Sequence, residues 1–164
     1  MTTWTPWQLN MDFNRTRTLG LLDKIEQLPD SAAALGFRPG PGRAHIAWQL
    51  MHIGITEELF ATARLAPDRA TIYADLVPRF RGGSVPDDQI PTVAEIRDVL
   101  AQGRTRLLET MQRFTEADLP LVKFVAPDGR QLTLQMIMHI LAWHEPHHQG
   151  QAHLTLNLFQ TAKG

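Results

Sequence analysis

Four long segments of the chain carry apolar residues at the spacing of three and four positions that is typical of amphipathic helices. These segments cover about residues 7–28, 43–65, 92–114 and 133–159. Thr92 followed by Glu95 forms a capping box at the start of the third helix, and Thr133 can cap the fourth. The pattern predicts an all-α fold built from four long helices.

The connections between these segments differ in length and composition. Residues 29–42 are rich in Pro, Gly and Ala and predict a loop with a short turn at 31–35. Residues 66–91 hold four prolines, which predicts a long crossover with a short helix near 70–76. Residues 119–130 predict a short extended piece and a turn. We therefore predict a single domain, 1–164, that forms a four-helix bundle with a long crossover between helices two and three.

Composition and charge narrow the class of protein. Charged residues make up 20% of the chain and apolar residues 43%, which is ordinary for a soluble globular domain. No apolar run approaches the ~18 residues of a membrane span, and no secretory signal is visible, so we expect a cytoplasmic protein. The net charge is −1 and the arginines form small pairs instead of a basic stripe, so we do not expect a nucleic-acid partner.

The chain has no cysteine, which excludes disulfides, thiolate metal ligands and a cysteine nucleophile. Any metal must therefore be held by nitrogen and oxygen ligands, for which seven histidines are available. Any thiol chemistry would need a thiol that is supplied from outside the chain.

Three histidines cluster in the fourth helix. His144 and His148 are one helical turn apart, about 40° around the axis, so both rings can point at one metal ion. Both continue the apolar seam of their helix, and His52 does the same on the second helix. Spacing alone also allows hydrogen-bonded core histidines. Since no Glu-x-x-His motif is present, a single metal fits better than a di-metal site.

His52 lies in the segment 43–58, and the segment 139–151 contains the run His144-Glu-Pro-His-His-Gln-Gly-Gln151. Both segments resemble the DinB/YfiT-like family of metalloenzymes. The resemblance implies a four-helix bundle in which His52, His144 and His148 bind one divalent transition metal, nickel or zinc, or else iron or manganese. It also implies a frequent homodimer and, in several relatives, a low-molecular-weight thiol such as bacillithiol or mycothiol. Pro146 departs from the family pattern and predicts a kink between the two ligands, because proline cannot bond the Ala142 carbonyl.

Three functions are open from the sequence. The first is a metal-dependent enzyme with a three-His site that transfers a thiol to a small electrophile, an expectation that rests on the family resemblance. The second is a metal-assisted hydrolase or isomerase that uses bound water, with Glu145 or His147 as the catalytic base. The third is a non-catalytic, stress-related dimer that binds metal. A small-molecule substrate and a homodimer are the expected partners, and Gln151 is a candidate hydrogen-bond partner for a ligand.

Overall fold

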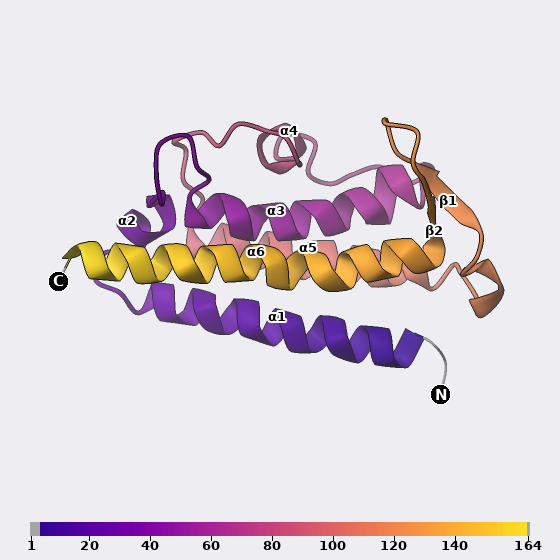
Figure 1. Cartoon of the computed structure of the whole chain (residues 1–164), viewed down its shortest axis with the longest axis horizontal. Helices are drawn as coiled ribbons and strands as arrows, with labels where there is room; N and C mark the ends of the chain where they lie inside the picture. Colours follow the sequence, from indigo (N-terminus) through magenta and orange to yellow (C-terminus); the bar gives the residue numbers. More distant parts are fainter. Residues whose placement is uncertain (1–3, 164) are drawn as a thin grey trace.

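The computed structural model of the chain describes residues 4–163. Its long helices are α1 (Trp4–Glu26), α3 (Ile46–Leu59), α5 (Val93–Met111) and α6 (Leu134–Lys163), which lie side by side as a bundle (Figure 1). Helix α3 packs against both α5 and α6, and α1 packs against α6. The predicted all-α four-helix bundle is therefore confirmed.

Helix α3 is the most deeply buried element of the bundle. Every residue from Ile46 to Glu58 is buried, so this helix has no solvent-facing side over that length. Its backbone touches that of α5 at two glycines. A Cβ on Gly54 would lie 2.7 Å from the Val99 carbonyl oxygen, and one on Gly103 would lie 2.5 Å from the Gly54 carbonyl oxygen. Only glycine allows this approach, which brings α3 into the centre of the bundle.

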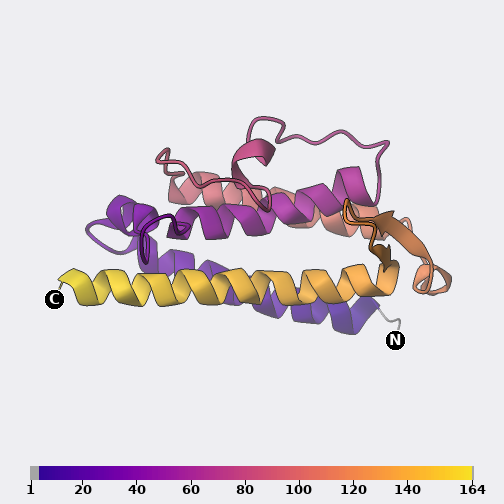
Figure 2. The same ribbon diagram turned by 45° about the horizontal axis from the view of Figure 1, so that its top comes forward.

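Short elements fill the first two connections. Helix α2 (Ser31–Gly36) confirms the predicted turn, and the long crossover passes over α3 (Figure 2). The prediction of a helix near 70–76 was wrong, because the crossover instead contains α4 (Val77–Phe80). Pro78 explains this position, since proline favours the first turn of a helix. The buried Phe80 ring anchors α4 on the bundle.

The third connection forms a small hairpin. After a short 3-10 turn, η2 (Glu116–Asp118), strand β1 (Val122–Val125) pairs antiparallel with β2 (Gln131–Thr133). The extended piece is confirmed, whereas the three-residue β2 was not predicted. Thr133 caps α6 as predicted, because its hydroxyl oxygen accepts a hydrogen bond from the Met136 N–H at 3.2 Å.

Helix α6 continues through Pro146. Neither view shows a sharp bend along this helix (Figures 1 and 2). The expected kink is therefore not seen. Proline leaves the Ala142 carbonyl without its partner within the helix, and the Asn14 side-chain amide of α1 donates to this carbonyl at 3.2 Å. A neighbouring helix thus satisfies the group that proline frees, and α6 stays regular between its histidines.

We expect Asn14→Ala to lower the free energy of unfolding by about 1–2 kcal/mol, because it leaves the partly buried Ala142 carbonyl without a donor. In a Pro146→Ala background the new backbone N–H can bond the same carbonyl, so the cost of losing Asn14 should fall by about 1 kcal/mol. Urea unfolding of the four variants measures this coupling. An equal cost in both backgrounds would contradict the compensation.

Candidate metal centre

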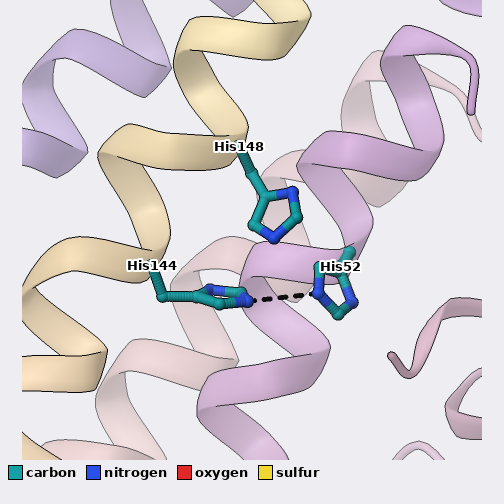
Figure 3. Close-up of side chains that lie close together, drawn as sticks. All are labelled: His52, His144 and His148. Atoms are coloured by element: carbon teal, nitrogen blue, oxygen red, sulfur yellow. Dashed lines mark hydrogen bonds between the residues drawn. The ribbon is translucent and has the colours of Figure 1, made fainter. Parts of the chain in front are cut away.

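Three histidines from two helices meet between α3 and α6. His52 comes from α3, and His144 and His148 come from α6 (Figure 3). One ring nitrogen of each lies within 4.8 Å of the others, and the Nε2 atoms of His52 and His144 are 3.1 Å apart. The structure therefore brings together the three residues that the sequence singled out as metal ligands.

Two of the rings are oriented by hydrogen bonds on the side away from the cluster. His52 Nδ1 lies 2.7 Å from the Phe80 carbonyl oxygen, and His148 Nδ1 lies 2.6 Å from Gln49 Oε1. Because both partners are acceptors, Nδ1 carries the proton in each ring and Nε2 keeps its lone pair. Metal-binding histidines typically have such a partner on the second nitrogen.

These two hydrogen-bond partners were not predicted from the sequence. Gln49 precedes His52 by three positions on α3, so it shares the face of that helix, and this spacing is a signal that could have been used. No sequence signal marks the Phe80 carbonyl, because every residue has a backbone carbonyl oxygen. The path of the crossover decides which of them meets His52.

All three imidazoles favour the neutral state. Burial, followed by the charges that His148 and His52 would carry, lowers the pKa of His144 to about 2. Burial, followed by the neighbouring histidines, lowers the pKa of His148 to about 3, and burial lowers that of His52. A neutral ring has the free lone pair that a metal needs.

The donor set fits a divalent transition metal. Two nitrogens that bind one ion at ~2.0–2.1 Å lie roughly 2.9–3.4 Å apart when the angle at the ion is between 90° and 109°. The 3.1 Å between His52 and His144 falls in that range. Within the described residues the group contains no carboxylate, and imidazole ligands suit zinc, nickel, copper and iron. Three ligands also leave positions for water or substrate.

Trp48 covers one side of the cluster. Its ring stacks on His52 with centroids 4.6 Å apart and planes 13° apart, and it meets the edge of His148 at 6.4 Å. Its Nε1 donates to the Arg79 carbonyl at 3.1 Å, which ties this ring to the crossover. His144 and His148 themselves are half-buried, so the centre is not sealed from solvent.

Glu145 lies apart from the three histidines. Its side chain is 1% exposed and accepts hydrogen bonds from Arg15 at 2.8 Å and Arg104 at 2.6 Å. Glu57 of α3 binds the same two arginines, at 2.9 and 2.7 Å, so the four charges form a closed buried quartet that joins all the long helices. This placement favours a role in fixing α6 against α3 over the role of catalytic base expected from the sequence.

His147 also lies outside the three-His group, at its rim. It is exposed, stacks on Trp143 at 4.4 Å and shares a hydrogen bond with Gln151 at 2.8 Å. Gln151 therefore contacts His147 and is not the partner of a candidate ligand. The His147 ring lies 4.9 Å from that of His148, so it stays close to whatever binds at the centre.

These features define an all-α four-helix bundle with a three-histidine group that can hold a metal ion between its second and fourth long helices. The family model described as the DinB superfamily matches residues 10–152, and the chain belongs to this superfamily.

Comparison with solved structures supports the fold. A crystal structure of a DinB-like protein from Bacillus cereus superimposes with a TM-score of 0.58 at 20% identity, covering 88% of this chain and 86% of that one. No curated protein matches the chain significantly. Among the helices described within residues 4–163, none has the length and apolar character needed to cross a membrane.

Proposed function

We propose that the chain is a metal-dependent enzyme in which His52, His144 and His148 bind one divalent transition metal, with zinc and nickel the first candidates. We further propose that it transfers a low-molecular-weight thiol to a small electrophile. The observation that carries the proposal is the convergence of three neutral imidazoles, two of them oriented by hydrogen bonds on the far nitrogen.

Some residues of the site hold the ligand rings in position, and another shields the metal centre from water. Gln49 and the Phe80 carbonyl keep two imidazoles in one tautomer, and Trp48 excludes water from one side of the centre. A bound divalent ion supplies Lewis acidity, which lowers the pKa of a coordinated thiol or water. Because the chain has no cysteine, the thiol that reacts must come from solution.

The test is turnover of 1-chloro-2,4-dinitrobenzene by zinc- or nickel-loaded protein, with and without bacillithiol, mycothiol or glutathione. In the expected reaction a sulfur–carbon bond forms, the carbon–chlorine bond breaks, chloride leaves and the thiol proton passes to buffer. We expect turnover that requires both thiol and metal and that is lost in His144→Ala. Turnover that ignores the thiol would contradict the transferase proposal.

Hydrolysis or isomerisation by bound water is the second candidate, and the position of His147 favours it. Its exposed ring lies 4.9 Å from that of His148, where it can accept a proton from a water at the centre. Thiol-independent hydrolysis of an activated ester that is lost in His147→Ala would support this alternative. If added metal raises the melting temperature of the protein but no turnover is found, the non-catalytic, stress-related bundle is favoured instead.

The homodimer and the small-molecule substrate remain predictions. Several large apolar side chains of α1 and α6 are exposed, including Leu9, Phe13, Trp143 and Leu154, which is compatible with a second copy covering them.

A further inference from the structure

A pocket of mixed polar and apolar character lies between the start of α3 and the C-terminal half of α6. Its volume is about 450 Å³, which is within the range of small-molecule binding sites. The segment before α3, the first turn of α3, the crossover and α6 all contribute to its wall. The wall residues include Arg43, Trp48, Gln49, Ser84, Gln151 and Thr155. The three candidate metal ligands do not line the pocket, but they belong to the same two long helices.

Two side chains of the pocket wall also contact the candidate ligands. The amide oxygen of Gln49 lies 2.6 Å from His148 Nδ1, and Trp48 stacks on His52 with ring centroids 4.6 Å apart. Both wall residues precede His52 by about one helical turn, so the wall begins roughly 5 Å from that ligand along the axis of α3. A small molecule that fills the pocket therefore lies within its own length of the candidate metal.

Helix α6 joins the pocket to the centre from the other side. Gln151 of the wall shares a hydrogen bond with His147 at 2.8 Å, and the His147 ring lies 4.9 Å from that of His148. Gln151 and Thr155 follow His148 by about one and two helical turns, which is roughly 5–10 Å along the axis. The pocket thus borders the centre on both helices that supply its histidines.

The charges of the wall favour an anionic ligand. Arg43 is the one charged side chain among the described residues that line the pocket, and it is exposed. Of the acids in the adjoining crossover, Asp87 is bound to Arg79 at 2.8 Å. Asp88 is bound to Arg38 at 2.9 Å. A carboxylate in the pocket would therefore meet one available guanidinium, which can bind it through two parallel hydrogen bonds.

The neutral groups of the wall suit a ligand with amide or hydroxyl groups. Because the amide oxygen of Gln49 is bound to His148, the NH₂ group of this side chain is the part left to donate to a ligand. Trp48 and Leu154 add apolar surface to the same wall. Peptide-linked and sugar-linked thiols combine these features in one small molecule.

We propose that this pocket holds the body of the thiol in the proposed transferase reaction and that Arg43 binds its carboxylate. The site then selects carboxylate-bearing thiols, such as bacillithiol and glutathione, over mycothiol, which has no carboxylate. This inference rests on the proposed function. It deepens that function by naming the class of thiol and the residue that recognises it.

The test measures binding of S-methyl thioethers, because a blocked sulfur can neither react nor bind a metal as a thiolate. S-methylglutathione is compared with its glycyl ethyl ester, and S-methylbacillithiol with its malate dimethyl ester, with and without zinc. The readout is the NMR shift of the Trp48 indole N–H and of the Gln49 side-chain amide, with the Trp7 indole as a reference outside the wall. We expect the acids to bind roughly fivefold or more tightly than the esters.

Arg43→Met should reduce the preference for the acids to below about twofold, and Arg43→Lys should keep part of it. Arg17→Met is the matched control, because Arg17 is also exposed but lines a different pocket, between α1 and α6. This control should keep the full preference for the acids.

Equal binding of acids and esters by the wild type would overturn the inference, and so would a preference that survives in Arg43→Met. Absence of saturable binding by both pairs up to roughly 10 mM would also overturn it. In that case metal- and thiol-dependent turnover would still leave the proposed function standing. If the acids bind with the Arg43-dependent preference but no thiol-dependent turnover is found, the transferase proposal fails and the assignment of the pocket to carboxylates stands.

Discussion

Glu145→Ala is expected to lower the free energy of unfolding by about 3–5 kcal/mol, among the largest effects of any single substitution in this chain. The reason is that Arg15 and Arg104 would remain buried and share the carboxylate of Glu57, while the exposed Asp12 lies no closer than 3.8 Å to Arg104. Burial lowers the pKa of Arg15, and in the wild type Glu57 and Glu145 together raise it above its ordinary value. Because arginine stays protonated in proteins, its charge would remain after the loss of Glu145.

Backbone carbonyls also accept hydrogen bonds from the two arginines of the quartet. Arg104 donates to the Met11 carbonyl at 3.0 Å, and Arg15 donates to the Leu100 carbonyl. Glu145→Gln preserves the shape of the side chain and removes its charge, so it should fall between the wild type and Glu145→Ala. Urea unfolding followed by circular dichroism measures all three proteins.

The control is an ion pair on the surface. Glu26 binds Arg97 at 2.8 Å with 57% of its side chain exposed, and Arg97 keeps a second partner in Asp23. Glu26→Ala should therefore change the free energy of unfolding by less than about 1 kcal/mol. If Glu145→Ala were as mild as Glu26→Ala, the quartet would not be what holds α6 against the rest of the bundle.

Replacing His52, His144 or His148 by alanine is expected to weaken the binding of zinc or nickel strongly. Loss of a hydrogen-bond partner of a metal ligand typically weakens binding roughly 10–100-fold, and loss of the ligand itself should weaken it more. Each substitution removes one of three nitrogen donors, and no carboxylate of the described group can replace it. In the wild type, metal at 100 times its dissociation constant should stabilise the fold by about 2.7 kcal/mol, which raises the melting temperature by roughly 5–10 °C.

His147→Ala is the matched control for these variants, because His147 is adjacent to a candidate ligand but exposed and bonded to Gln151. It should keep the metal affinity and the metal-dependent rise in melting temperature. Competition with a coloured zinc chelator gives the affinities. Equal loss in His147→Ala and His144→Ala, or no loss in any of the four variants, would show that the metal binds elsewhere.

Much of the fold follows from local patterns in the sequence. The spacing of apolar residues predicts the four long helices, and Thr92 with Glu95 forms the capping box that starts α5. Because His52 and His144 stand on the core-facing sides of their helices, packing those sides together brings the rings within reach of each other. Such features can be predicted from the helical period and from the rule that the apolar faces of helices pack against each other.

Other features depend on which residue meets which across the bundle. The sequence presents Glu145 as a neighbour of two histidines, whereas the helix turns it through about 100° toward Arg15 and Arg104. The kink expected at Pro146 is absent, and Asn14, on another helix, bonds the Ala142 carbonyl that proline leaves without a partner in α6. Periodicity gives the face of a residue but not its partner on that face, so these contacts could not be foreseen from one sequence.

The central claim is that three imidazoles of one chain bind one metal ion, and X-ray absorption at the zinc edge tests it most directly. The protein should be free of any histidine tag and loaded with one equivalent of zinc. We expect zinc to be coordinated by three imidazole nitrogens at ~2.0–2.1 Å and by at least one further light ligand. In His52→Ala we expect two imidazoles or loss of the metal. A wild-type spectrum with one imidazole or none, or zinc content well below one ion per chain, would contradict the claim.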